Sequence, residues 1–371
     1  MTAPLDVCLR GAGIVGRALA LLLAADRLRV GLVDAPTAAS AAGGAAPDVR
    51  AYAINAASRD LLQRVRAWPE EAATPVLGMQ VQGDAGATVR FDAPGTSGEP
   101  LAWIVEASAL MQALDRALDY QPQVERLAAP APAALTVVCE GKASATRAEL
   151  GVEWDLQPYP QQALAARLQG TLPHGQVARQ WFGQGEILAL LPMGQGPQAR
   201  EVSLVWSLPP AQAERWMALP AAEFEARLTE ASGQALGALT LVSERARWPL
   251  QRARARTWTG PGWALAGDAA HTIHPLAGQG LNLGLADVRV LADVLRSREY
   301  WRPLGDPRLL RRYARARQLD VTAMQFATDG LQALFSQPEP GWGWLRNWGM
   351  RGFDRISPLK RWVARQAAGG A

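Results

Sequence analysis

Glycine residues near the start of the chain are spaced in a way that can bind the phosphates of a nucleotide. Gly11, Gly13 and Gly16 form the pattern G-x-G-x-x-G. The first glycine permits a tight turn, the second lets a pyrophosphate approach the backbone, and the third lets the following helix pack closely. The helix N-terminus adds N–H donors and a positive partial charge. The pattern therefore predicts the ADP half of NAD, NADP or FAD.

The elements that must position these glycines follow in the expected order. The mostly apolar residues Leu5 to Leu9 predict a strand, Arg17 to Asp26 a helix, and Val30 to Val33 a second strand that ends in Asp34. A carboxylate at that place accepts hydrogen bonds from ribose hydroxyls. Strand, turn, helix, strand and acid together predict a Rossmann-like unit, and a glycine turn without a ligand is the alternative.

A second glycine-rich segment lies far downstream. Its apolar residues Trp263 to Gly267 predict a strand that delivers Asp268 to the sheet edge where open α/β sheets bind ligands. The carboxylate of Asp268 is then placed to bond a polyol hydroxyl. Gly278 and Gly280 open an apolar-periodic helix whose N-terminus points back toward the ligand. Because both motifs must serve one ligand, we expect a discontinuous nucleotide-binding domain.

The second segment carries a family resemblance. Residues 267–282 read G-D-A-A-H-x-x-x-P-x-A-G-Q-G-x-N, which is similar to the class A flavoprotein monooxygenases, the p-hydroxybenzoate-hydroxylase-like family. The fuller string H-P-L-A-G-Q-G-L-N-L-G-L-A-D most resembles the hydroxylases of ubiquinone biosynthesis. Other segments extend the resemblance along almost the whole chain, among them Asp48-Val-Arg50, Trp248-Pro-Leu250 and the residues Tyr313 and Arg317.

The resemblance implies FAD as the cofactor and assigns residues to it. Gly11, Gly13, Gly16 and Asp34 would lie on the adenosine side, with Gly267 and Asp268 on the ribityl and pyrophosphate side. Arg50 would approach the flavin or its phosphates. The turn beside the isoalloxazine ring would contain Pro275, Gly278, Gln279, Gly280, Leu281 and Asn282. Backbone N–H groups at that helix start can stabilise the negative charge of a reduced flavin. No residue is assigned as an acid or base.

The resemblance also implies a reaction. Reduced flavin would bind O2 as a C4a-hydroperoxide and transfer oxygen to the ring of a hydrophobic, polyprenylated phenol in ubiquinone biosynthesis. The electrons would come from NAD(P)H or an electron-transfer partner. The alternatives are a hydroxylase of a soluble aromatic compound and a non-catalytic flavin-fold accessory protein of a quinone-biosynthesis complex. Glu140-Gly141 stands where the family has D-G, which puts FAD binding or turnover in doubt.

The expected fold class is α/β: a discontinuous Rossmann-like FAD-binding domain of the GR2 type, an inserted β-sheet substrate domain and a C-terminal helical segment. The FAD-binding domain would comprise residues 1–75, 101–151 and 255–330. The substrate domain would comprise residues 76–100 and 152–254, whose β-type runs are separated by Gly and Pro clusters. The helical segment would be 331–371.

Composition excludes several other classes. Two cysteines and three histidines leave no ligand set for a metal, and His271 with His274 has no further ligand nearby. No run of residues is apolar enough for a spanning helix. From Gln251 onward, 18 Arg and Lys stand against 9 Asp and Glu, but no recognition motif accompanies this charge, so we expect no nucleic-acid partner.

The end of the chain is basic and aromatic. Residues 345–366 alternate Trp, Phe, Leu and Ile with Arg and Lys, a pattern that suits a membrane surface. A helix that docks its apolar face on the core or on a partner is the equal alternative. The expected location is cytoplasmic, with peripheral attachment to the inner membrane if the first alternative holds.

Overall fold

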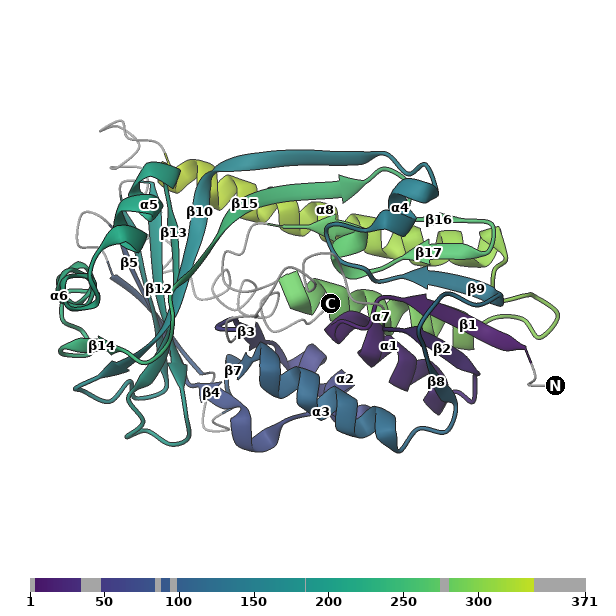
Figure 1. Cartoon of the computed structure of the whole chain (residues 1–371), viewed down its shortest axis with the longest axis horizontal. Coiled ribbons are helices and arrows are strands. Elements are labelled where there is room, and N and C mark those ends of the chain that lie inside the picture. Colours follow the sequence, from purple (N-terminus) through teal and green to yellow (C-terminus); the bar gives the residue numbers. More distant parts are fainter. Residues whose placement is uncertain are drawn as a thin grey trace.

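The computed structural model describes residues 4–34, 48–83, 88–93, 99–183, 185–273 and 280–336, with side chains as far as residue 324. Figure 1 shows a sheet with helices packed against it at one end of the molecule and a larger sheet at the other, joined by two long strands. A small sheet lies between them. The predicted α/β class is confirmed.

The sheet at the nucleotide end has six strands in the order β16-β17-β9-β1-β2-β8. All neighbouring pairs are parallel except β16 and β17. The strands are β1 (Leu5–Arg10), β2 (Val30–Val33), β8 (Val124–Leu127), β9 (Ala133–Val138), β16 (Thr259–Gly260) and β17 (Trp263–Leu265). They come from three separate parts of the chain, which confirms the predicted discontinuity.

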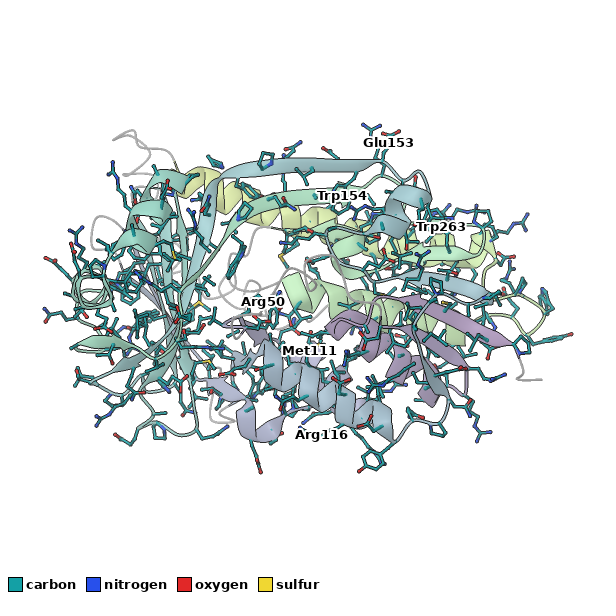
Figure 2. All side chains as sticks on the ribbon, viewed as in Figure 1. Arg50, Met111, Arg116, Glu153, Trp154 and Trp263 are labelled. Atoms are coloured by element: carbon teal, nitrogen blue, oxygen red, sulfur yellow. The ribbon has the colours of Figure 1, made fainter. Side chains whose placement is uncertain are left out.

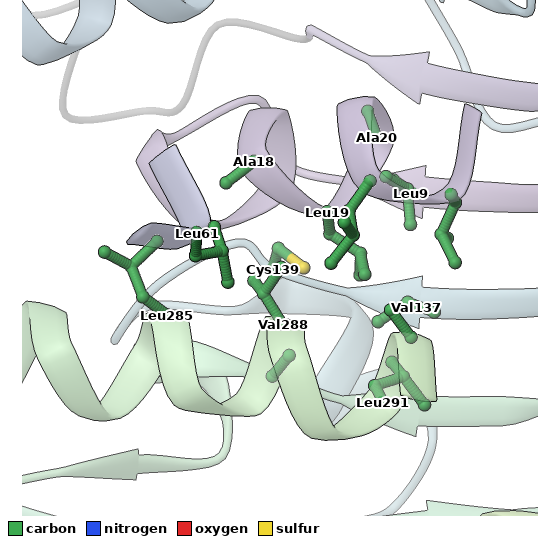
Figure 3. Close-up of a cluster of buried hydrophobic side chains, with 14 of the residues drawn as sticks. Leu9, Ala18, Leu19, Ala20, Leu61, Val137, Cys139, Leu285, Val288 and Leu291 are labelled. Atoms are coloured by element: carbon green, nitrogen blue, oxygen red, sulfur yellow. The ribbon is translucent and has the colours of Figure 1, made fainter. Parts of the chain in front are cut away.

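Helices pack on this sheet through apolar side chains. The helices are α1 (Ile14–Ala25), α3 (Ala107–Asp119), α7 (Gly280–Arg296) and α8 (Pro307–Ser336), and α1 contacts both α3 and α7. Figure 3 shows Leu19 of α1, Val137 of β9 and Leu291 of α7 in one buried cluster. Helix α1 begins at Ile14 rather than at the predicted Arg17, because Gly13 is already its N-cap.

The small sheet has the order β3-β7-β4 and is antiparallel. Its strands are β3 (Ala51–Ile54), β4 (Thr74–Val76) and β7 (Ala102–Glu106). The helix α2 (Ala56–Arg64) follows β3, and the short helix η1 (Glu70–Ala72) precedes β4. Asn55 caps α2 by accepting a hydrogen bond from the Ser58 N–H. The chain therefore leaves β3 and enters α2 at a fixed angle.

The large sheet has nine strands, in the order β18-β15-β10-β13-β12-β11-β5-β6 with β14 paired to β10. Its only parallel pair among the described strands is β11 with β5. The strands are β5 (Gly78–Gly83), β6 (Thr88–Asp92), β10 (Trp154–Gly170), β11 (Val177–Gly183), β12 (Glu186–Met193), β13 (Glu201–Leu208), β14 (Leu239–Leu241), β15 (Ala246–Ala255) and β18 (His271–Thr272).

The two faces of the large sheet have different neighbours. Leu164, Leu204 and Trp206 point to the outer face, where Phe224 packs on them from the pair of helices α5 (Pro210–Ala218) and α6 (Ala221–Ala231). The opposite face meets the small sheet through a second cluster that includes Ile104 and Met193. This alternation is the period-two pattern of a sheet buried on both sides.

Two predicted domain limits differ from the strands and helices. β18 lies beyond residue 254 yet pairs with β15 of the large sheet. The limit at residues 330 and 331 falls inside α8, which continues to Ser336 because no proline interrupts it after Pro307. The rest of the predicted helical segment, including 345–366, lies outside the described residues. No helix of the described part is both long and apolar enough to cross a bilayer.

Candidate functional site

The first glycine turn has the geometry that the motif predicts. Gly11 follows β1 with a φ of +112°, and a Cβ there would lie 2.6 Å from the carbonyl oxygen of Cys139. A Cβ on Gly16 would lie 1.9 Å from the Gly11 carbonyl oxygen. A Cβ on Gly13, by contrast, would have no atom within 4 Å. Two glycines are thus required by packing, while the third faces open space at the start of α1.

The start of α1 is suited to an anion. No side chain caps the helix at Gly13, so its first N–H groups are directed toward that open space. This cradle fits the pyrophosphate of a dinucleotide, because the missing side chain at Gly13 leaves the space in front of these N–H groups open. The prediction from the spacing therefore agrees with the local geometry.

Asp34 lies at the end of β2, as predicted, and its side chain is 48% exposed. Arg17 of α1 lies 3.4 Å from its carboxylate, and the same guanidinium also bonds to Asp115 of α3 and to the Ala12 carbonyl. Arg17 is buried, so it holds Asp34 from the protein side. The opposite side of the Asp34 carboxylate is left accessible for a ribose.

The second motif converges on the same place. β17 leads into the short helix η2 (Gly267–Ala269), where Gly267 has a φ of +64°. Cβ atoms on Gly267 and Gly284 would approach the Val15 side chain to 3.1 and 2.8 Å. Because Val15 is in the first turn of α1, the start of α7, η2 and the first glycine turn are packed together.

Asp268 lies in η2 at this junction and is half-buried. Burial raises the pKa of its carboxyl above the ordinary value of 3.8, while the nearby charges of Lys142, His271 and Arg50 oppose the rise. A partly buried carboxylate with cations near it is suited to accept hydrogen bonds from hydroxyl groups. This is the arrangement predicted for the ribityl side of the cofactor.

A buried charge network beneath Asp268 was not predicted as such. Asp287 of α7 is fully buried and accepts hydrogen bonds from the Gly267 N–H at 2.8 Å, from His271 at 2.7 Å and from Arg317 of α8 at 2.7 Å. Burial alone would raise the pKa of Asp287, but His271 and Arg317 outweigh it and lower the pKa. The network therefore fixes the backbone that carries Asp268.

His271 has a structural role in this network. Its ring stacks on Trp258 with centroids 5.0 Å apart and bonds to Asp287, so it does not face a ligand. The described residues contain no group of three metal-ligating side chains. His274 lies outside the described residues, as do Pro275, Gly278 and Gln279.

The start of α7 is described from Gly280. Asn282 donates from its side chain to the Ala53 carbonyl at 2.7 Å and accepts from the Asn55 N–H at 3.1 Å. Its amide therefore joins α7 to the β3–α2 corner. Any contact of Asn282 with a cofactor would come from its backbone, next to Gly280 and Leu281, rather than from this amide.

Arg50 directly precedes β3 and lies near the middle of the molecule, between the two larger sheets (Figure 2). It forms a two-pronged contact with Asp48, at 2.6 Å for the closest pair, and that hydrogen bond raises the pKa of Arg50 further. Asp268 contributes in the same direction, so the two predicted residues are near neighbours. The Arg50 side chain is 55% exposed, and its contact with the cofactor stays a prediction.

Glu140, at the end of β9, is bound within its own loop. It accepts hydrogen bonds from the Ser144 hydroxyl at 2.7 Å and the Thr146 N–H at 3.0 Å, where the helix α4 (Ala145–Glu149) begins, and lies 3.3 Å from Arg10. Burial alone would raise the pKa of Glu140, but these contacts lower it. The longer side chain thus still stabilises the loop beside the cradle.

Comparisons with known proteins agree with this geometry. A family model described as FAD binding domain matches residues 121–327. The chain is 32% identical to the 3-demethoxyubiquinol 3-hydroxylase of Escherichia coli over 392 residues, which cover 99% of each protein. The chain belongs to the FAD-binding monooxygenase family. FAD is its cofactor, and the residues of the cradle described above fit that molecule.

Other members of the family extend the comparison. The ubiquinone hydroxylase UbiL of Rhodospirillum rubrum is 32% identical over 98% of this chain and 89% of its own length. Among solved structures, PqsL, a probable FAD-dependent monooxygenase from Pseudomonas aeruginosa, superposes with a TM-score of 0.76 at 22% identity, covering 94% of this chain and all of PqsL. That likeness concerns the fold.

Proposed function

We propose that this FAD-dependent monooxygenase hydroxylates the aromatic ring of a polyprenylated phenol on the route to ubiquinone. The observation that carries the proposal is the resemblance to the 3-demethoxyubiquinol 3-hydroxylase over 99% of the chain, and the open glycine turn at the start of α1 supports it. When bound and reduced, FAD supplies the activation of O2 that ring hydroxylation needs. Two electrons come from NAD(P)H or from a partner protein.

The chain's own residues would hold the cofactor from two sides. Gly11, Gly13 and Gly16 would admit the pyrophosphate, Asp34 would bind the ribose, and Asp268 and Arg50 would bind the ribityl and phosphate side. The start of α7, with Gly280, Leu281 and Asn282, would face the flavin ring together with Pro275, Gly278 and Gln279. Helix N–H groups there would stabilise negative charge on the reduced ring.

The large sheet would exclude water from the reaction. Its inner face packs on the small sheet through apolar side chains, which include Ala189, Leu191 and Met193. A dry site favours oxygen transfer over release of peroxide, because water would compete for the activated oxygen. We place the protein at the cytoplasmic face of a membrane or in a quinone-biosynthesis complex, where such a substrate is found.

The experiment is to measure oxygen consumption by the FAD-loaded protein with a reductant, with and without the polyprenylated phenol. Substrate-dependent consumption without matching peroxide supports the proposal. Peroxide alone would favour an accessory role, and turnover of only water-soluble phenols would favour the soluble substrate. The quinone profile of a deletion strain identifies the ring position: an intermediate that lacks one hydroxyl is expected.

A further inference from the structure

The connection between α7 and α8 lies at the end of the molecule away from the large sheet (Figure 1), and two of its aromatic side chains are exposed. Tyr300 is 94% exposed and Trp301 is 68% exposed, and their rings meet edge to face with centroids 5.0 Å apart. Most of the protein's other tryptophans with described side chains are buried or half-buried. Exposing two large aromatic rings to water is unfavourable, because their apolar surface gains hydrophobic free energy only when it is buried.

The connection that carries this pair is held in one shape. Arg302 forms ion pairs with Glu299 at 2.8 Å and with Asp306 at 3.2 Å, and Leu304 is buried. The Gly305 carbonyl accepts a hydrogen bond from the Gly262 N–H at 3.0 Å. The two rings are thus presented by an ordered connection anchored on the six-stranded sheet.

A stripe of arginines begins next to this pair. Arg308, Arg311, Arg312 and Arg315 are all exposed and follow the i, i+3, i+4, i+7 spacing of one face of α8. Arg312 is close enough to Glu299 to lower the pKa of that carboxyl, after the larger effect of Arg302. The stripe and the aromatic pair therefore form one continuous surface.

The charge of this surface is concentrated. Residues 296–315 contain seven arginines and two acidic residues, a net charge of +5, whereas the whole chain carries +4. Both acids, Glu299 and Asp306, are paired with Arg302, so they offset the charge of the four stripe arginines only in part. Like charges three and four residues apart destabilise a helix. Repulsion among the four arginines therefore destabilises α8, and an anionic surface would relieve this repulsion.

We propose that the stripe and the aromatic pair dock the protein on a bilayer that contains anionic phospholipids. Arginine binds phosphate oxygens in a two-pronged manner, and tyrosine and tryptophan side chains favour the interface between water and lipid. The stripe extends for about 10 Å along the helix, which suits several headgroups. The aromatic pair, at a convex end of the molecule, would enter the headgroup region. The docking surface is independent of the proposed reaction.

The test measures binding of the full-length holoenzyme to vesicles of phosphatidylcholine alone and of phosphatidylcholine with phosphatidylglycerol. One variant replaces Arg308, Arg311, Arg312 and Arg315 with Gln. Its control replaces Arg64, Arg66, Arg116 and Arg215 with Gln, four exposed arginines elsewhere, and so removes equal charge. We expect the stripe variant to bind anionic vesicles at least about a hundred-fold more weakly, and the control to bind as the parent does.

A second pair of variants tests the aromatic residues. Tyr300→Ser with Trp301→Ser is expected to weaken vesicle binding and to remove a lipid-induced blue shift of tryptophan emission. Tyr120→Ser, which changes a ring that is 87% exposed elsewhere, should leave both unchanged. Unaltered binding by the stripe variant, or equal loss in its control, would overturn the proposal. The proposal would also be overturned if the parent protein did not bind vesicles and its stripe bound an acidic protein or a nucleic acid instead.

Discussion

Arg317 and Arg167 are two almost fully buried arginines in very different surroundings. Arg317, 2% exposed, bonds to Asp287 and Asp320 at 2.7 and 2.6 Å and to the Leu283 carbonyl at 3.2 Å. Arg167 of β10, 6% exposed, has Glu106 at 3.5 Å, the Arg50 carbonyl at 3.4 Å and the Met193 sulfur at 3.2 Å. One charge is fully paired and the other only loosely.

The pKa values of the two arginines shift in opposite directions. Burial lowers the pKa of Arg167 and Glu106 only partly opposes it, whereas Asp287 outweighs the burial of Arg317 and raises its pKa. Beside Arg167, across the β10–β13 pair, Ser203 is buried and its hydroxyl has no hydrogen-bond partner in the described part of the chain. The Asp287 network is therefore held by paired charges and hydrogen bonds, whereas the charge of Arg167 at the contact between the large and small sheets is only loosely paired.

Asp287→Asn should have the largest effect on stability, because it removes the carboxylate at the centre of the buried network. It removes the buried carboxylate that pairs with Arg317 and leaves the guanidinium with only the exposed Asp320, which costs about 3 to 5 kcal/mol of unfolding free energy. Chemical denaturation measures this loss. FAD affinity should fall too, because the single amide oxygen of Asn cannot accept from the Gly267 N–H and from Arg317 at once. Asp320→Asn is the control, because the Asp320 side chain is 63% exposed and should cost little. Equal costs for the two variants would contradict the comparison.

Gly16→Ala tests the packing of the first glycine turn. The added Cβ would meet the Gly11 carbonyl, so the helix must move, at a cost of about 1 to 3 kcal/mol. FAD affinity should fall with it, as measured by quenching of flavin fluorescence on binding. Gly13→Ala is the matched control for stability, because its Cβ meets nothing. If Gly13→Ala also leaves FAD affinity intact, the pyrophosphate does not approach that glycine as proposed.

The parts of the site that the sequence predicted depend on local backbone geometry. Gly11, Gly16 and Asp34 belong to a short segment whose strand, turn and helix specify their positions. The Asp287 network joins residues 16 and 30 positions apart, and only the packing of α7 on α8 brings them together. The one feature of the sequence that pointed to this network is that Asp287 is the last residue of the family motif at 274–287. For Arg167, the signal is a charge within residues 163–168 of β10, whose other members are all alanine or leucine.

Glu140→Gln tests the position at which this chain has Glu where the family has Asp. The folded-state pKa of Glu140 is below its ordinary value of 4.5, so its ionised form stabilises the fold above that pH. This contribution is lost as the pH falls through the folded-state pKa. At neutral pH the variant should lose about 1 kcal/mol, and the difference from the parent should shrink below about pH 4.5. A difference that stays constant in acid would show that the charge is unimportant.

Arg167→Met should have the smallest effect on stability and separates the two buried arginines most sharply. Methionine keeps much of the side-chain volume and removes a charge that is paired only at 3.5 Å, so the unfolding free energy should change by less than about 1 kcal/mol. Glu106 would not be stranded, because its side chain is 38% exposed and accepts a hydrogen bond from the Ser108 hydroxyl at 3.2 Å. Arg317→Met, the same chemical change, should destabilise strongly, since it removes the guanidinium that pairs with the fully buried carboxylate of Asp287. Denaturation curves of the two variants under one set of conditions measure the contrast. If Arg167→Met proved as costly as Arg317→Met, the contact between the sheets would be fixed by charge as firmly as the nucleotide edge.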